Sequence, residues 1–417
     1  MSNTIRITDL ANPQLTEIQR AALDYGEQQP VDFSESAVLD AARQRTGLDD
    51  FGPGDFRERL QLLIDEWGND PDMTRSQRAN LFGYLVRYAS NRLLIQSEWT
   101  RHPDILKQEI RQPIIVAGLP RSGTTHLLNL LAADTRFRSL PLWESYEPVP
   151  MPGEQPLPDG TDPRYQRCEE AWQGMQQVTP LLAAMHPMNP DHIHEELELM
   201  GPDFASYNFE WLAPSPRWRD HYYATDQTPH YAYMRDVLKL LQHFRGPDRW
   251  VLKCPQHLEQ LPVLREVFPD ATYVITHRDP VAVIQSAVTM IAYGQRMGRK
   301  RIDTKALIDY WCDRVEHLLQ ACVRDRPSMP ESQTVDVPFH EFMADDMAMV
   351  EKIYSKAGVE LTGKARGEMQ AFIDAHPRGK EGKVVYDLKG DFGVDPAELR
   401  ERFAFYFERF PAKPEVG

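Results

Sequence analysis

The sequence predicts an α/β protein of three layers: helices on both faces of a mostly parallel sheet of about five strands, preceded by a helical N-terminal extension. Three observations lead to this prediction. Residues 114–132 pass from a buried-strand pattern through a glycine-rich turn into a helical pattern. Residues 249–289 alternate strand, helix, strand and helix, which is the order typical of a parallel sheet. Residues 1–110 show amphipathic helical spacing without strand signals.

Residues 1–110 are therefore expected to form a helical region, followed by an α/β domain over residues 111–417. The apolar positions of residues 56–67 and 78–99 recur every three or four residues, as on one face of a helix. This region could cover an acceptor cleft, or it could pair with a second subunit in a homodimer. Its residues leave both roles open.

The segment 114–132, IIVAGLPRSGTTHLLNLLA, has the properties of a phosphate cradle. Gly118 and Gly123 permit a sharp turn and the close approach of a ligand. The hydroxyl groups of Ser122, Thr124 and Thr125 can donate hydrogen bonds to phosphate oxygens. Because the next helix also points its open N-terminus at the turn, an anion there gains hydrogen bonds and the positive end of the helix dipole.

The spacing of this cradle fits the nucleotide triphosphate pattern GxxxxGK[ST], so the fold is expected to be P-loop-like. Thr124 stands where that pattern has a lysine, and the nearest cation is Arg121, three residues earlier. The motif therefore predicts phosphate binding and only weakly favours ATP. A small-molecule kinase stays open as an alternative, as does a nucleotide-binding or scaffold protein without catalysis.

Residues 140–250 interrupt the sheet with a long insertion rich in proline and aromatic residues. Since loops above a strand edge commonly form binding pockets, we expect the insertion to bind the acceptor. Its aromatic residues favour a hydrophobic or aromatic molecule, although aromatic rings also stack on sugars. They are Trp172, Phe204, Tyr207, Phe209, Trp211, Trp218, Tyr222 and Tyr223.

Beyond the insertion, strands are expected over residues 250–254 and 272–276, with a helix over residues 258–268 between them. His277, Arg278 and Asp279 then follow at the carboxyl edge of the sheet, where ligands of open parallel sheets bind. Later elements should complete the unit: helices over 305–323, 343–357 and 396–410, and a strand over 334–339.

Together the two clusters resemble the sulfotransferases that use 3′-phosphoadenosine 5′-phosphosulfate (PAPS), in particular the bacterial branch of that superfamily. The resemblance extends over residues 110–395. The family motif PRSGTT implies that the 5′-phosphosulfate is held by Arg121, Ser122, Gly123, Thr124 and Thr125. The implied activity is transfer of the sulfonate group from PAPS to a hydroxyl, or less readily an amine, of a small acceptor. The product is adenosine 3′,5′-bisphosphate (PAP), and this chemistry requires no metal.

The family motif RDPxxxxxS implies that Arg278 and Ser286 hold the 3′-phosphate, which ATP lacks. A late loop with Arg378 and Gly379 resembles the family segment that closes over the same phosphate. Lys253 matches the family lysine that neutralises the transferring sulfonate. In the adenine pocket, His126 and His340 stand where the animal enzymes have aromatic side chains.

The general base is the open point of this chemistry. Pro255 stands where the animal cytosolic enzymes have their histidine, whereas Glu144 lies at the distance from the first motif at which other branches have a glutamate. We therefore expect Glu144 to be the base, with His257 as the alternative. The acidic pair Glu195 and Glu196 is a third candidate, for which a solvated helix face is the plainer explanation.

Composition is consistent with these expectations. The chain of 417 residues is 41% hydrophobic and 26% charged, as in an ordinary globular protein. Its net charge of -15 disfavours nucleic acid and anionic membranes as partners. Four cysteines without a CxxC pair indicate reduced thiols. The first ten residues lack a signal-peptide pattern, and no apolar run approaches the roughly 18 residues of a membrane span, so a cytoplasmic location is expected.

Overall fold

A four-stranded sheet organises the computed structural model, which describes residues 4–247, 249–377, 380 and 382–416. All of its pairings are parallel, and the strand order is β3 (Val251–Lys253), β2 (Ile114–Gly118), β4 (Thr272–His277) and β5 (Thr334–Pro338). Ile114 pairs with both Val251 and Thr272, so the carboxyl ends of β3, β2 and β4 meet at one edge of the sheet. The expected α/β class is confirmed, and the described residues place four strands in this sheet.

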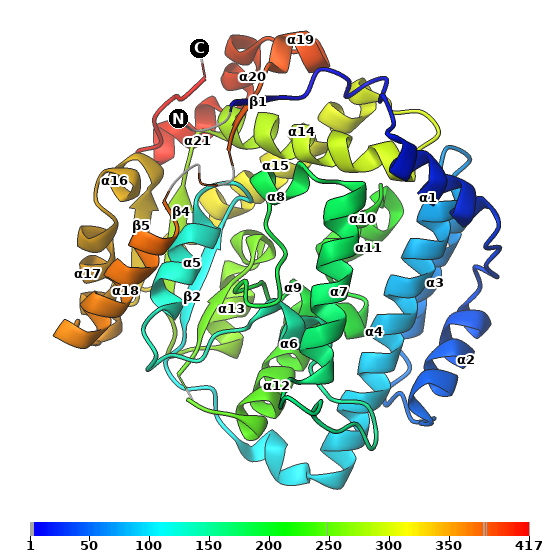
Figure 1. Cartoon of the computed structure of the whole chain (residues 1–417). Helices are drawn as coiled ribbons and strands as arrows, with labels where there is room; N and C mark the ends of the chain where they lie inside the picture. Colours follow the sequence, from blue (N-terminus) through cyan, green and yellow to red (C-terminus); the bar gives the residue numbers. More distant parts are fainter. Residues whose placement is uncertain (1–3, 248, 378–379, 381, 417) are drawn as a thin grey trace.

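Alternate residues of each strand face opposite layers of helices, as strand geometry requires (Figure 1). Ile114 and Val116 pack on one layer, and Ile115 and Ala117 pack on the other. The first layer consists of α5 (Thr124–Ala132), α16 (Phe339–Ala344), α17 (Asp346–Ala357) and α18 (Gly363–Ala375). The second consists of α12 (Thr228–Phe244), α13 (Leu261–Val267), α14 (Pro280–Gly298) and α15 (Thr304–Asp325).

Several expected helices are divided. The one expected over residues 258–268 becomes the 3₁₀ helix η3 (Pro255–Glu259) followed by α13, because Pro262 fits only the first turn of a helix. The one expected over residues 343–357 begins at Asp346, since the Asp345 carboxylate accepts the Ala348 N–H at 2.9 Å and caps α17. The C-terminal pattern forms α19 (Leu388–Phe392), α20 (Pro396–Arg402) and α21 (Ala404–Arg409).

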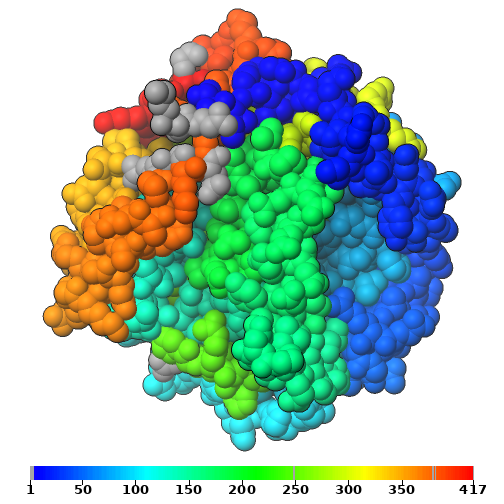
Figure 2. All heavy atoms as spheres, in the orientation of Figure 1, coloured from blue at the N-terminus to red at the C-terminus, as the bar shows by residue number. Residues whose placement is uncertain are grey.

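The N-terminal helices and the insertion share one hydrophobic core. Leu63 of α3 and Leu85 of α4 are fully buried against Phe204, Phe209 and Trp218 of the insertion, and the two segments lie against each other in Figure 2. The N-terminal helices are α1 (Glu17–Glu27), α2 (Glu35–Thr46), α3 (Phe56–Gly68) and α4 (Arg75–Arg101), which 3₁₀ helix η1 (Pro103–Lys107) follows.

The insertion is mostly helical, and much of its aromatic content lies in the core instead of lining a pocket. Phe204, Tyr207, Phe209, Trp218 and Tyr222 are all buried. Its helices are α6 (Leu142–Tyr146), α7 (Pro163–Val178), α8 (Leu182–Met185), α9 (Leu197–Met200), α10 (Asn208–Leu212), α11 (Pro216–Ala224) and α12, with 3₁₀ helix η2 (Gly201–Asp203); a further 3₁₀ helix, η4 (Arg326–Ser328), follows α15.

The N-terminal region also contains a strand that its sequence did not predict. β1 (Thr4–Arg6) pairs in parallel with β6 (Lys383–Val385), which ties the start of the chain to its late segment. The strand is three residues long, so its own pattern is too short to be distinguished from a loop. Among the described residues, no helix is both long enough and apolar enough to cross a membrane.

Candidate active site

The turn between β2 and α5 is shaped by two positions that exclude ordinary side chains. A Cβ on Gly118 would lie 1.9 Å from Thr276 Oγ1, so only glycine fits between β2 and β4. Gly123 has a φ of 83°, a left-handed conformation that favours glycine. Arg121 adopts a φ of 65°, which is uncommon for a residue with a side chain. The backbone is thus bent so that the turn opens at the carboxyl edge of the sheet.

The hydroxyl groups of the turn have different roles. Ser122 is buried, and its Oγ donates to the Leu119 carbonyl at 2.6 Å and lies 2.8 Å from Thr276 Oγ1, so it fastens the turn to β4. Thr124 is buried and Thr125 is half-buried. Helix α5 begins without a side-chain cap within the described chain. Its first-turn N–H groups are therefore donors available to an anion.

Arg121 and Arg278 lie together at this turn, although they come from segments 157 residues apart. Arg278 Nη1 donates to the Arg121 carbonyl at 2.5 Å. Arg121 Nε donates to Ser286 Oγ at 3.0 Å, and the Ser286 hydroxyl also bonds Tyr386 Oη at 2.9 Å. Burial lowers the pKa of Arg121, and the charge of Arg278 lowers it further, although a guanidinium keeps its proton in proteins. The structure therefore brings residues of both motifs to one site.

Lys253 ends β3 at the same edge and is almost fully buried. Its ammonium group lies 3.4 Å from Thr125 Oγ1 and forms an ion pair with Glu195. Burial raises the pKa of Glu195, and the charge of Lys253 opposes that rise. The carboxylate closest to the lysine is thus Glu195, which is buried and not part of a solvated helix face.

Three histidine rings surround this pair on the insertion side. The ring centroids of His186, His192 and His194 are 5.7–6.2 Å apart. Burial lowers the pKa of His192 to about 4, and the charge of Lys253 acts in the same direction. Burial also lowers the pKa values of His186 and His194. All three are therefore neutral at pH 7. Within the described chain, no group of three or more His, Cys, Asp or Glu side chains could hold a metal ion.

His257 lies behind this site and is fully buried. Its Nε2 is 3.2 Å from Glu196 Oε2, and its Nδ1 is 3.0 Å from Tyr231 Oη. Glu196 in turn accepts the backbone N–H of Lys253 at 2.9 Å. Because both ring nitrogens have partners, His257 holds Glu196 and the end of β3 in place and has no free nitrogen for a substrate.

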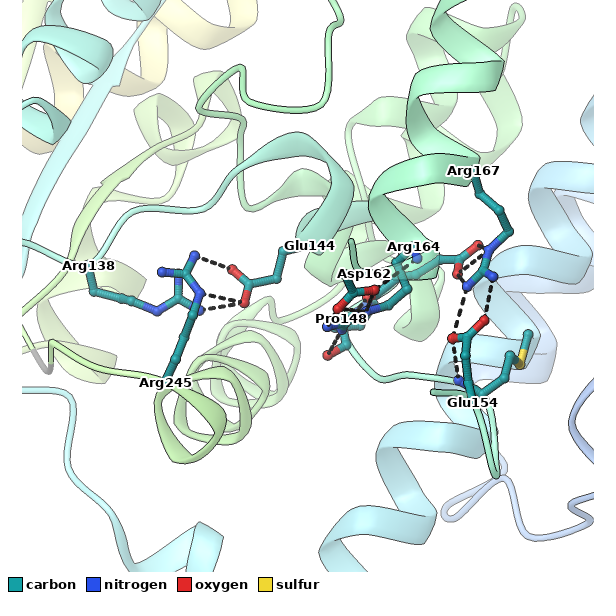
Figure 3. A network of polar contacts seen from close by, with 10 residues as sticks. Arg138, Glu144, Pro148, Glu154, Asp162, Arg164, Arg167 and Arg245 are labelled. Atoms are coloured by element: carbon teal, nitrogen blue, oxygen red, sulfur yellow. Dashed lines mark hydrogen bonds and ion pairs between the residues drawn. The ribbon is translucent and has the colours of Figure 1, made fainter. Parts of the chain in front are cut away.

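Glu144 occupies the opposite end of β3. Its carboxylate accepts from Arg138 Nη2 at 2.7 Å and from Arg245 Nη2 at 3.0 Å, and Figure 3 shows both guanidinium groups directed at it. The backbone of Arg138 pairs with the start of β3, since Val251 N–H donates to the Arg138 carbonyl at 3.0 Å. Of these two carboxylates, Glu195 lies beside the cradle through its ion pair with Lys253, whereas Glu144 is paired with Arg138 at the start of β3.

The structure describes both histidines that were expected around adenine, His126 and His340. His126 Nε2 lies 3.2 Å from Asp346 Oδ2, and its ring is near Phe342, with centroids 5.5 Å apart. His340 is half-buried on α16. Arg378 and Gly379, expected to close over the 3′-phosphate, lie outside the described residues.

A separate cavity of about 440 Å³ lies between α4, α6 and α7. Its wall includes Tyr84, Arg87 and Tyr146, together with Arg164 and Arg167 of α7, two arginines that Figure 3 shows held by carboxylates. The Tyr146 ring lies 6.4 Å from the ring of His194. Burial lowers the pKa of His194, and the charges of Lys253 at the cradle and of Arg87 in the cavity wall act in the same direction.

Two contributors were absent from the sequence-based prediction. Tyr386 stands within the late segment that was singled out, but a tyrosine in a charged loop gives no signal of its own. His186 follows α8 and approaches the other two histidines only in the folded insertion. A pattern of nearby residues cannot reveal either contact, because each partner lies on a different element.

Known proteins resemble this chain over most of its length. Residues 113–363 match the model of the sulfotransferase family. The crystal structure of sulfotransferase STF9 from Mycobacterium avium is 25% identical, with a TM-score of 0.83 over 93% of this chain and 100% of that one. Sulfotransferase STF1 from Mycobacterium tuberculosis H37Rv is 28% identical, with a TM-score of 0.77 over 89% of this chain and 98% of that one. No curated protein matches the chain. Since the family model spans more than half of its residues, the chain belongs to the sulfotransferase family.

Proposed function

We propose that this sulfotransferase moves the sulfonate group of PAPS to a hydroxyl of a small acceptor and releases PAP. The observation that carries the proposal is the meeting of Arg121 and Arg278 beside the open N-terminus of α5. Two guanidinium groups at one phosphate cradle suit a nucleotide with anionic groups on both its 5′ and 3′ positions. ATP carries no 3′-phosphate and would leave Arg278 without its anion.

Lys253 and the first-turn N–H groups of α5 are proposed to stabilise the transfer. As the acceptor oxygen forms a bond to sulfur, the bond from sulfur to the 5′-phosphate oxygen breaks and negative charge grows on the departing PAP. The Lys253 ammonium, 3.4 Å from Thr125 Oγ1, is suited to meet that charge. Losing one preorganised donor of this kind typically costs about 10²- to 10³-fold in rate.

Glu195 is proposed as the general base that takes the proton of the acceptor hydroxyl. Its ion pair with Lys253 supports this role, because it holds the carboxylate beside the cradle. A buried carboxylate with a raised pKa is also a stronger base than a solvated one. When the sulfonate draws Lys253 toward itself, Glu195 loses its partner and its affinity for a proton increases.

The N-terminal helices and the insertion are proposed to form the acceptor side of the protein. The cavity between α4 and α7 is of a size typical of small-molecule sites. Its wall combines two tyrosine rings with arginines, so an acceptor with an aromatic or hydrophobic ring and polar substituents would suit it. Tyr146 of the cavity wall lies with its ring centroid 6.4 Å from that of His194, the residue before Glu195.

Nucleotide-dependent thermal unfolding tests the proposal. PAP should raise the melting temperature, whereas ATP with magnesium should not, because a ligand stabilises only the state to which it binds. Arg278→Gln should remove the PAP shift, and Arg301→Gln, an exposed arginine on the same chain, should retain it. Equal or larger shifts with ATP would favour a kinase. PAP binding without transfer to any compound in a broad acceptor mixture would favour a protein without catalysis.

A further inference from the structure

The C-terminal segment reaches into the proposed 3′-phosphate site. After α21 the chain passes the carboxyl end of β4, and Glu415 contacts Arg278 there. The two carboxylate oxygens of Glu415 accept from Arg278 Nε at 2.8 Å and from Nη2 at 2.7 Å. The third nitrogen, Nη1, donates to the Arg121 carbonyl. All three nitrogens of this guanidinium are therefore engaged within the chain.

The contact is held by other parts of the segment. The Glu415 N–H donates to Asp279 Oδ2 at 2.7 Å, and the fully buried Asp279 also caps α14 by accepting the Val281 N–H. Upstream, the Phe410 ring stacks on His277 with centroids 4.1 Å apart. Two contacts thus hold Glu415 over Arg278 in addition to its own side chain: its backbone N–H bonds Asp279, and Phe410 upstream stacks on His277.

A carboxylate and a phosphate present the same geometry to arginine. Either group can offer two oxygens to the planar fork formed by Nε and Nη2. The Arg278 guanidinium also lies 3.9 Å from the centre of the Phe339 ring, which fixes its plane. The side chains of Arg278 and Glu415 are 22% and 30% exposed, so an anion from solution can reach the pair.

We propose that Glu415 occupies the 3′-phosphate position when the nucleotide is absent, and that a 3′-phosphorylated nucleotide displaces it. The proposal rests on the function proposed above, in which Arg278 binds that phosphate. A phosphate carries more negative charge than a carboxylate, so it wins the exchange when PAPS binds. After transfer, the return of Glu415 to Arg278 assists the release of PAP.

Calorimetric titrations of PAP and of 5′-AMP test the exchange. Glu415→Gln should bind PAP about two- to fivefold more tightly, which corresponds to the contribution of a partly exposed ion pair. Its affinity for 5′-AMP should equal that of the wild type, because AMP has no 3′-phosphate to place on Arg278. Glu408→Gln is the matched control: it removes the same charge from an exposed position on α21 and should change neither affinity.

Hydrogen exchange provides a second measurement that does not depend on the variant. Saturating PAP should increase exchange at the amide of Glu415, whose bond to Asp279 is lost when the segment leaves, and AMP should not. Unchanged or slower exchange with PAP would overturn the inference, as would weaker or unchanged PAP binding by Glu415→Gln. Equal tightening for PAP and AMP would mean a general charge effect and would also overturn it. A wild-type protein that binds no PAP at all would instead overturn the proposed function itself.

Discussion

The two ends of strand β3 carry buried glutamates with different surroundings. At its start, Glu144 is held by Arg138 and Arg245. At its end, Glu195 pairs with Lys253, which also lies within 3.4 Å of a cradle hydroxyl. Burial alone does not distinguish a structural carboxylate from a reactive one. The two glutamates differ in whether the cation paired with each can also bind a second anion. Lys253 would do so when a sulfonate binds.

The largest expected effect separates these two carboxylates by activity. Glu195→Gln should lower kcat by about 10²- to 10⁴-fold, because the amide cannot accept the acceptor proton. PAP affinity should stay near the wild-type value, since an amide oxygen can still accept from Lys253. The melting temperature should fall, because the buried ammonium loses its counter-charge, so transfer is compared per folded molecule. Steady-state sulfonate transfer from PAPS measures the loss. Activity within tenfold of wild type would show that Glu195 is not the base and would remove the contrast between the two ends.

The reciprocal substitution should act on stability. Glu144→Gln leaves the fully buried Arg138 guanidinium without its carboxylate, so the free energy of unfolding should fall by about 3 kcal/mol. Turnover per folded molecule should change little. Urea denaturation measures the loss. The control is Arg245→Gln, which removes the partner that is 44% exposed and should cost less than about 1 kcal/mol. A collapse of turnover in a folded Glu144→Gln protein would restore Glu144 as the base.

Sequence patterns predicted the elements that rest on local contacts. The β-branched run of β4 and the glycine-rich turn before α5 can be recognised in the sequence, because strand packing and a phosphate-sized turn restrict the residue types directly. The strand β1 was missed because the strand with which it pairs, β6, lies more than 370 residues away. The aromatic residues of the insertion were expected to line a pocket, whereas Phe204, Phe209, Trp218 and Tyr222 are buried with helices of the N-terminal region.

The candidate site was predictable where its residues belong to local motifs and not where long-range contacts place them. Arg121, Arg278 and Ser286 belong to motifs, and the structure brings them together. The choice between Glu144 and Glu195 depends on which end of β3 each one reaches. That placement follows from the pairing of Pro141 with Ile193, a long-range contact without a local pattern. The approach of Glu415 to Arg278 likewise has no signature in the sequence.

The ends of β3 should also differ in their dependence on pH. His192 has an ordinary pKa of 6.5, lowered to about 4 by burial near Lys253. Between these values the unfolded chain binds a proton that the folded one does not, so the free energy of unfolding should fall as pH decreases from 6.5 toward 4. The difference of about 2.5 pKa units sets an upper limit on the order of 3 kcal/mol for this group.

Denaturation across this pH range measures that dependence. His192→Gln should make the profile between pH 6.5 and pH 4 less steep, with the remaining slope coming from His186 and His194, whereas His102→Gln, at an exposed histidine, should leave it unchanged. A His192→Gln profile as steep as that of the wild type would mean that the acid sensitivity arises at other groups. The comparison between the two ends would then fail for pH while still holding for catalysis.

The smallest expected effect concerns Tyr386, at the carboxyl edge of the sheet. Its hydroxyl bonds Ser286, which also accepts from Arg121, so it helps to orient the side chains proposed to hold the nucleotide. Tyr386→Phe removes that hydrogen bond, and the dissociation constant for PAP should increase about two- to tenfold. The free energy of unfolding should change by less than about 0.5 kcal/mol, because the side chain is only half-buried.

Tyr25→Phe is the matched control, since that ring is 67% exposed on α1 and its hydroxyl should not affect PAP binding. Titration calorimetry and urea denaturation on the same samples separate binding from stability. Weaker PAP binding at unchanged stability would mark the carboxyl edge as a ligand surface, in contrast to the ion cluster at the start of β3. Lower stability with unchanged PAP binding would instead make Tyr386 a structural residue like Glu144. The two ends would then differ only in the residues that contact the reacting groups.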